Sequence, residues 1–300
     1  MLLCTFTVRG EAPGSQRAGI VEGQRVVELA QRRTMIELIE DGGAATAEPS
    51  SLSHPLGDAI LHAPIRRPGK ILATIVNTRG MLGGQDVTLD RPRIDMKAPS
   101  AVIGPGVEIR GPRSGIRPEV ELAAIVGKAI SRCSRAQAES AIFGYTVLND
   151  VTAPADSRED AYEAYRRDKR KGEIRKTTLR GPLFRSKNHD TFCPMGPWVR
   201  TPEENLQWDG LRMTTRFDGT LVQDGSTSEY IFSAAEVASY VSQFLTLEPG
   251  DVVSCGSVGW TREALGDLDP TEFVLPARSG SLELEIEGVG KLANPVSFVQ

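Results

Sequence analysis

The feature that most constrains the fold is a series of short apolar runs separated by turns rich in Gly and Pro. The chain has 30 Gly and 19 Pro among 300 residues. Short runs bounded by such residues are typical of β-strands, and few longer helical patterns interrupt them. The pattern favours a mostly β or α+β core over alternating strand–helix units. The predicted strands are 2–8, 19–21, 26–29, 70–76, 100–103, 119–126, 145–149, 211–217, 251–254 and 281–286.

Helices are expected in only a few places. Residues 34–41, 53–62, 134–142 and 234–244 have helical patterns, and Ser233 is a plausible cap for the last of them. The Pro-rich connector at 64–69 marks a domain boundary. The sequence therefore predicts a small N-terminal domain, 1–65, and a larger domain, 66–300.

Charge excludes one class of partner. The 39 acidic and 35 basic residues give a net charge of -4, so no basic field points to a nucleic acid. Residues 156–180 nevertheless contain nine Lys or Arg, with a polar helical pattern around 160–171. This segment is either a solvated helix face or a cover or subunit contact over an anionic site.

The chain has only three His and four scattered Cys, without the spacing of a zinc site. Any metal must therefore be held by oxygen ligands. Isolated Cys residues fit a reducing interior. No stretch approaches the roughly 20 apolar residues that span a bilayer, and the first apolar run ends at Arg9. We therefore expect a cytoplasmic protein that does not enter a membrane.

Three carboxylates lie at the ends of predicted strands. Glu119 and Glu121 share one face of a strand that continues as an apolar run to Val126, and Asp150 ends a second apolar run. Adjacent carboxylates repel, and hard divalent cations prefer oxygen ligands. Two interpretations remain at this point: the carboxylates form a metal site, or they lie at a solvent-exposed strand end.

Six motifs in order give the chain a family resemblance. From Pro68 to Val299 it resembles the fumarylacetoacetate hydrolase superfamily, and the first 65 residues look like the small leading domain of many members. The motifs are P-G-K-I through Asn77 at 68–77, E-V-E-L-A with V-G-K at 119–128, G-Y-T to N-D-V at 144–151, S-K with D-T-F-C-P-M-G-P-W at 186–198, D-G with Gln223 and Thr227 at 218–227, and L-E-P-G-D-V-V with Gly256 at 247–256.

The resemblance implies a rolled, mostly β fold, usually a homodimer, and a concrete site. Glu119, Glu121 and Asp150 would hold Mg²⁺ or Mn²⁺, which would stabilise the enolate of a small anionic carbonyl substrate. Lys187 would place a positive charge on the developing oxyanion. The expected substrate contacts are Arg79, Gln223, Thr227, Gly256 and Ser257.

The departures from the family pattern concern the catalytic base. Met81 stands where hydrolytic members have a His, and Gly84 where they have a Glu. A thioether cannot accept a proton near neutral pH. His189 lies two residues after Lys187 and would share its face in an extended segment. We hypothesise that His189 replaces the missing base, although a hydrogen-bonded loop His is the alternative.

The sequence thus predicts a divalent-metal-dependent enzyme acting on a small 2-oxo acid or β-dicarbonyl compound. Hydrolytic C–C cleavage is the reaction that the resemblance favours. Keto–enol isomerisation or decarboxylation tolerates loss of the water-activating His and Glu more easily than hydrolysis does. A non-catalytic ligand-binding homologue is the alternative from another class.

Overall fold

A large twisted sheet organises the molecule. The computed structural model describes residues 1–12, 14–82, 87–168, 172–203 and 207–299. Within them, a 12-stranded sheet has the order β4-β3-β2-β1-β14-β11-β10-β17-β6-β7, with β5 on β1 and β8 on β14. These strands are β1 (Leu2–Val8), β2 (Arg17–Glu22), β3 (Arg25–Leu29), β4 (Pro49–Pro55), β5 (Ala59–His62), β6 (Ile71–Thr74), β7 (Ile94–Lys97), β8 (Val102–Ile103), β10 (Val120–Val126), β11 (Ile142–Asn149), β14 (Cys193–Arg200) and β17 (Val252–Ser257).

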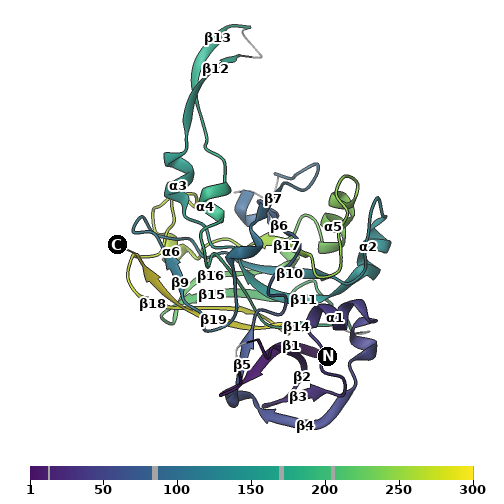
Figure 1. Cartoon of the computed structure of the whole chain (residues 1–300). Helices are drawn as coiled ribbons and strands as arrows, with labels where there is room; N and C mark the ends of the chain where they lie inside the picture. Colours follow the sequence, from purple (N-terminus) through teal and green to yellow (C-terminus); the bar gives the residue numbers. More distant parts are fainter. Residues whose placement is uncertain (13, 83–86, 169–171, 204–206, 300) are drawn as a thin grey trace.

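A second sheet packs against the centre of the first. Apolar residues of β10 and β11 share one buried cluster with residues of this five-stranded sheet, including Val120, Val147, Met213 and Leu284. Figure 1 shows the two sheets rolled against each other. The mostly β fold expected from the sequence is therefore confirmed. The second sheet contains, in order, β16 (Thr220–Ser226), β15 (Arg212–Phe217), β18 (Gly280–Ile286), β19 (Gly290–Phe298) and β9 (Ile109–Gly111).

The helices are short and lie at the margins. Three of the four predicted helices form and begin with capping boxes, which satisfy backbone N–H groups of the first turn. The prediction of a helix over 53–62 is wrong. Pro55 and Gly57 interrupt that segment, and β4 and β5 flank them. The helices are α1 (Met35–Glu40), α2 (Arg135–Ala141), α3 (Pro154–Glu159), α4 (Phe184–Lys187), α5 (Ala234–Ser242) and α6 (Arg262–Leu265).

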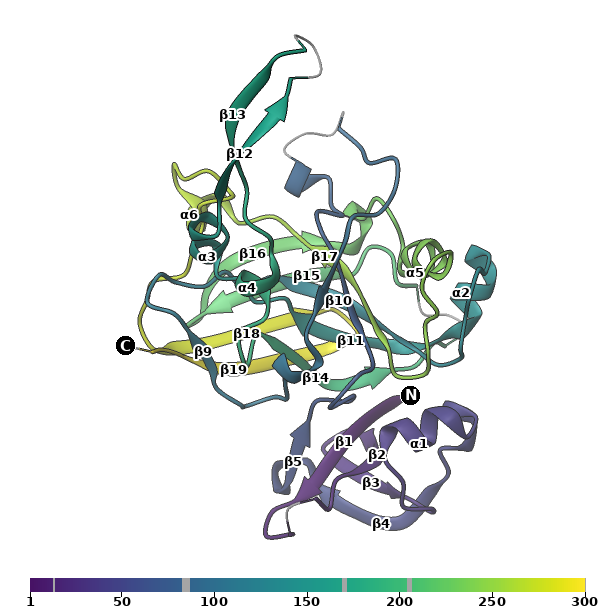
Figure 2. The ribbon, with the colours of Figure 1, turned by 45° about the horizontal axis from the view of Figure 1, so that its top comes forward.

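The N-terminal segment is part of the large sheet. The predicted domain 1–65 contains β1 to β5 and α1, and Figure 2 shows it beside β14. Leu2 and Leu3 of β1 lie opposite Arg200 and Val199 of β14. Leu3 also belongs to a buried cluster that includes Leu148 of β11. The sheet therefore links the N-terminus to the strand that precedes Asp150.

The basic segment 156–180 forms a hairpin, so the helix predicted around 160–171 is wrong. After α3, β12 (Tyr162–Arg167) pairs in an antiparallel ladder with β13 (Ile174–Leu179). Tyr, Ile and Thr residues favour extended structure here. Figure 1 shows the hairpin projecting from the body. Residues 169–171 of the predicted helix lie outside the described part of the chain.

Within the described ranges, no helix combines the length and the apolar character needed to cross a bilayer.

Candidate metal centre and its cavity

Strand register brings the three predicted carboxylates together. In the antiparallel pair β10–β11, Val120 lies opposite Asn149, so the start of β10 adjoins the end of β11. The Asp150 amide donates to the Glu119 carbonyl at 2.9 Å. Glu119, Glu121 and Asp150 are all buried, and each offers a carboxylate oxygen within 4.8 Å of the others'.

Two buried lysines partly balance these charges. Lys187, at the end of α4, donates from Nζ to Glu119 Oε2 at 2.7 Å and to Asp150 Oδ2 at 2.6 Å. Lys97 Nζ lies 2.7 Å from Asp150 Oδ1 and donates to the Lys187 carbonyl at 2.6 Å. Burial opposes the charge on Lys187, but Asp150 and Glu119 outweigh it and hold its pKa well above the usual range. The sequence pattern did not indicate Lys97, which follows no recognised motif.

Glu121 is the carboxylate without a cationic partner. Its Oε2 accepts hydrogen bonds from Ser254 Oγ and from the Gly256 amide, the latter at 3.2 Å. Among the described residues no Lys or Arg forms an ion pair with it. Burial, and then the neighbouring Asp150 carboxylate, raise its pKa well above the ordinary value. A further positive charge at this point would stabilise the ionised form.

The donor set fits a hard divalent cation. It consists of three buried carboxylates, and Mg²⁺ and Mn²⁺ prefer oxygen ligands. No His or Cys among the described residues lines the surrounding cavity, so nothing there favours a softer metal. The environment of Glu121 also fits a bound cation, because neither Lys97 nor Lys187 forms an ion pair with this carboxylate.

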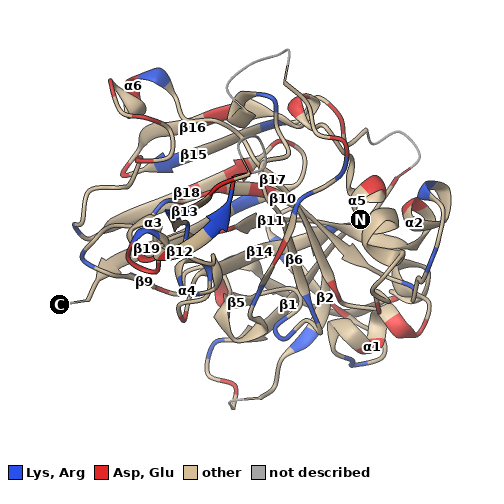
Figure 3. Cartoon of the chain, turned by 90° about the horizontal axis from the view of Figure 1, so that it is seen from above, with Lys and Arg blue, Asp and Glu red and all other residues tan. Residues whose placement is uncertain are grey.

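The triad opens into a cavity of about 560 Å³. Figure 3 looks onto this side of the molecule, where acidic and basic segments meet beside β10. Residues around the cavity come from β6, β7, α3, α4, the foot of the hairpin and the loop before β18. The polar lining residues include Thr74, Asp95, Arg117, Glu119, Glu121, Asp150, Thr152, Ser157, Arg158, Thr178, Arg180, Ser186, Lys187, Ser257, Thr271 and Glu272.

Some predicted residues line this cavity and others do not. The three carboxylates, Lys187, Ser257 and Met81 do so. The cavity also contains three arginines that sequence reasoning did not select, Arg117, Arg158 and Arg180. Loop and hairpin geometry places these arginines, and no sequence motif marks those segments. The predicted residues outside the lining are Arg79, His189, Gln223, Thr227 and Gly256.

His189 does not share a face with Lys187, so that expectation is wrong. Lys187 ends the short helix α4, and the extended segment that the hypothesis required is absent. The His189 ring lies 4.8 Å from Phe192, centroid to centroid, and its Nε2 is 2.5 Å from Asp156 Oδ2. His189 therefore has the hydrogen-bonded environment of the alternative interpretation.

The side chains of Gln223 and Thr227 form hydrogen bonds with other residues of the protein. Gln223 Oε1 accepts from the Val120 amide at 3.1 Å and from Thr215 Oγ1 at 2.8 Å. Its Nε2 donates to Ser257 Oγ and to the Val258 carbonyl. Thr227 Oγ1 accepts from the Leu211 amide. These bonds hold the ends of β10, β16 and β17 together, and a direct substrate contact by either residue stays a prediction.

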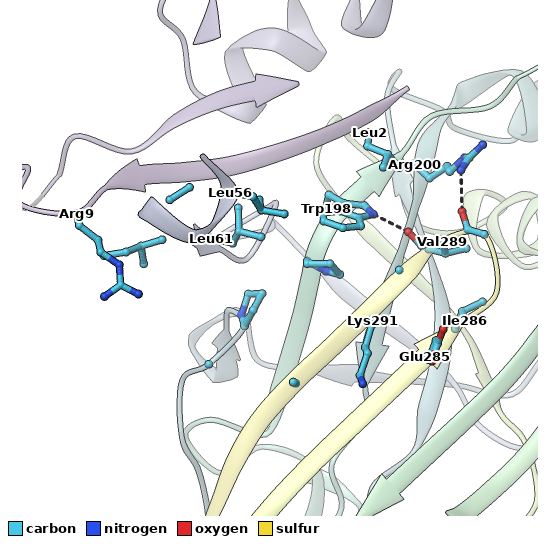
Figure 4. A pocket seen from close by; sticks show the side chains of 18 residues that line it. Leu2, Arg9, Leu56, Leu61, Trp198, Arg200, Glu285, Ile286, Val289 and Lys291 are labelled. Atoms are coloured by element: carbon cyan, nitrogen blue, oxygen red, sulfur yellow. Dashed lines mark hydrogen bonds between the residues drawn. The ribbon is translucent and has the colours of Figure 1, made fainter. Parts of the chain in front are cut away.

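A second, larger hollow has a different chemistry. It measures about 760 Å³ and lies between the N-terminal strands and β18–β19 (Figure 4). Leu2, Leu61 and Trp198 contribute to an apolar lining, and Trp198 donates to the Val289 carbonyl. Glu285 is its one lining carboxylate among the described residues. The triad, not this hollow, therefore carries the candidate chemistry.

Fold and site together define a mostly β protein with a buried centre of oxygen ligands. The family model described as fumarylacetoacetate (FAA) hydrolase C-terminal matches residues 71–297. The chain therefore belongs to the fumarylacetoacetate hydrolase family.

Its relatives include enzymes of several reaction types. The chain is 30% identical over 292 residues to oxaloacetate tautomerase YisK of Bacillus subtilis (strain 168), covering 95% of this chain and 87% of that protein. It is 29% identical over 302 residues to 2,4-didehydro-3-deoxy-L-rhamnonate hydrolase of Sphingomonas sp. (strain SKA58), covering 99% and 96%. A solved maleylpyruvate hydrolase from Sphingobium sp. SYK-6, in complex with manganese (II) ion and pyruvate, matches over the whole of both chains with a TM-score of 0.72 and 25% identity.

Proposed function

We propose that this chain is a divalent-metal-dependent tautomerase that interconverts the keto and enol forms of a small 2-oxo acid. One observation carries the choice of reaction. The cavity beside the triad contains Met81 and, among the described residues, no His. Hydrolytic cleavage needs a base that activates water, whereas tautomerisation needs enolate stabilisation, removal of a proton from the enol oxygen or the adjacent carbon, and delivery of a proton to the other atom.

The residues of the chain have separate parts in this chemistry. A divalent cation held by Glu119, Glu121 and Asp150 would act as a Lewis acid on the substrate oxygens. Lys187 would hold a second positive charge beside the same oxygens, because its ammonium lies within 2.7 Å of two of the three carboxylates. Burial of the triad and of Lys187 strengthens their electrostatic effect.

The proton must move through another group. Asp95 and Glu272 are the cavity carboxylates outside the triad. Neither forms an ion pair among the described residues, so each is available to take the proton from the enol oxygen and deliver a proton to the adjacent carbon, or the reverse. We propose that one of them is the proton carrier. The variants Asp95→Asn and Glu272→Gln identify the proton carrier. Replacement of the carrier should lower kcat about tenfold or more with little change in KM, and replacement of the other carboxylate should not. Unchanged kcat in both variants would exclude this role.

The relatives support two reactions. Oxaloacetate tautomerases at 30% identity support the tautomerase. The hydrolase of Sphingomonas, which the chain covers almost completely, supports hydrolytic C–C cleavage as the second candidate. Among the described residues no His lines the cavity, and this supports tautomerisation over hydrolysis.

A substrate panel tests the proposal. The purified protein with Mg²⁺ or Mn²⁺ is offered enol-oxaloacetate, acylpyruvates and a hydroxymuconate-type enol, and the loss of enol absorbance is followed. The tautomerase predicts a metal-dependent loss with enol-oxaloacetate and no cleavage of acylpyruvates. Glu121→Gln is the control: added Mg²⁺ or Mn²⁺ should not speed its loss of enol absorbance.

Each other result has a defined meaning. Release of pyruvate from acylpyruvates would make the chain a hydrolase, and rapid release of CO₂ from oxaloacetate would make it a decarboxylase. No turnover on the panel, despite metal binding, would favour the non-catalytic homologue.

A further inference from the structure

Three arginines converge on the cavity from separate parts of the chain. Arg117 precedes β10, Arg158 lies in α3, and Arg180 follows β13 at the foot of the hairpin. They add three positive charges to a cavity in which Lys187, the lining lysine among the described residues, is already paired with the triad. The tautomerase chemistry proposed above does not use them.

Arg117 is the innermost of the three. Its Nε donates to the Phe273 carbonyl at 3.2 Å, and its Nη2 donates to the Thr271 carbonyl. Its Nη1 lies 3.8 Å from Glu119 Oε1, and only 11% of the side chain is exposed. The guanidinium is therefore fixed at one edge of the carboxylate triad, with one nitrogen beside the metal centre.

Arg158 and Arg180 stand at the exposed rim. Arg180 Nε donates to Ser157 Oγ at 3.3 Å. Within the described ranges neither guanidinium forms an ion pair with a carboxylate. The neighbouring acids are taken by Arg185, which pairs with Asp156, Glu159 and Asp160. The two rim arginines thus keep their charge available to the cavity.

The three guanidiniums belong to residues that line the same cavity. Like charges that face a common cavity are destabilising unless an anion lies between them. A guanidinium fork matches the two oxygens of a carboxylate, so a carboxylate is the anion that this arrangement suits best.

We infer that Arg117, Arg158 and Arg180 bind a second carboxylate of the substrate, at the end remote from the 2-oxo acid group. The inference rests on the proposed function, and it narrows the substrate class to 2-oxo dicarboxylates. Arg117 would bind the second carboxylate nearest the triad, and the two rim residues would close around it from the hairpin side. These arginines then determine specificity, while the triad and Lys187 carry the chemistry.

Paired substrates test this role. The Mg²⁺-loaded protein is assayed with enol-oxaloacetate and with its 4-ethyl monoester, which keeps the 2-oxo acid group and loses the second charge. The double variant R158Q/R180Q should raise KM for the dianion about tenfold or more and leave the monoester within about twofold. Arg166→Gln, on the same hairpin but outside the cavity, is the matched control and should change neither.

A binding measurement separates this inference from the proposed reaction. Calorimetry compares unreactive L-malate with the monoanion L-lactate on the same proteins. The wild type should bind malate about tenfold more tightly, and R158Q/R180Q should lose that preference. If the wild type shows the preference but turns over no 2-oxo acid, the proposed function fails and the arginine site stands. Equal effects of the double variant on both substrates, or none on either, would overturn the arginine site.

Discussion

At the scale of single residues, the centre is a cluster of opposite charges with one carboxylate left over. Alternate residues of a strand share a face, which predicted that Glu119 and Glu121 lie together, and the family resemblance added Asp150 as the third ligand. It also predicted Lys187 through a motif. Lys97 could not be predicted, because its contact with Asp150 depends on the packing of β7 against α4 and the end of β11.

Lys97→Met tests the role of the second lysine. The change leaves the Lys187 and Val151 carbonyls without a buried donor and removes a positive charge from Asp150. Removing one partner of a buried ion pair costs about 3–5 kcal/mol, so we expect the free energy of unfolding to fall by about that amount in urea titrations. A loss below about 1 kcal/mol would show that Lys97 is not needed for the cluster.

Glu121→Gln tests the centre as a metal site. Because Glu121 is the carboxylate without a cation, its neutral isostere should fold well and bind the metal poorly. The expected result is that excess Mn²⁺ raises the Tm of the wild type and leaves the Tm of the variant nearly unchanged. Glu283→Gln, on the exposed β18 surface and paired with Lys291, is the control. An equal Tm increase in wild type and E121Q would contradict the ligand assignment.

At the scale of elements, the strands were more predictable than the helices. Each of the ten segments predicted as strands overlaps an observed strand, although in the second sheet they cover only β15 and β18, and Ser233 caps α5 as expected. The segments 53–62 and 160–171 were predicted as helices because their charge and apolar spacing permits one. Strand pairing outweighed that local preference, since each segment found a partner strand.

Gly256 is the residue on which the shape of β17 depends. It has a φ of 89°, and a Cβ there would lie 2.9 Å from Asn77 Cβ. Gly256→Ala should therefore lower the free energy of unfolding by about 1–3 kcal/mol. It should also weaken Mn²⁺ binding, because the Gly256 amide orients Glu121. Thermal unfolding with and without Mn²⁺ measures both effects.

The same strand end offers a matched control. A Cβ at Gly259 would have no neighbouring atom within 4 Å, and the φ of Gly259 is not in the positive region. Gly259→Ala should change stability by less than about 0.5 kcal/mol. Equal losses in the two variants would mean that the close approach at Gly256 is unimportant.

At the scale of the whole molecule, the N-terminal strands share a sheet with the larger C-terminal part of the chain. The pairing of β1 with β14 joins residues almost two hundred positions apart, and no local pattern in the sequence could indicate it. The cluster around Leu3 includes Ile125 of β10 and Leu148 of β11. Stability of the metal centre should therefore depend on the N-terminal residues.

Leu3→Ala tests that dependence. Leu3 is fully buried, and loss of a buried Leu costs about 2–5 kcal/mol. Urea unfolding should shift by this amount in a single transition, whether it is followed by Trp fluorescence or by far-UV circular dichroism. Leu52→Ala, with 60% of the residue exposed, should change little. Two separated transitions in either protein would show that the N-terminal strands unfold independently.

The reaction that we propose for the centre is keto–enol interconversion without cleavage of a carbon–carbon bond. The most direct test follows ¹³C-labelled enol-oxaloacetate by NMR with the Mg²⁺-loaded protein. Keto signals should replace enol signals much faster than without protein, and pyruvate and bicarbonate should form no faster than in the protein-free sample. Pyruvate and bicarbonate rising at the rate at which the enol disappears would contradict the proposed reaction.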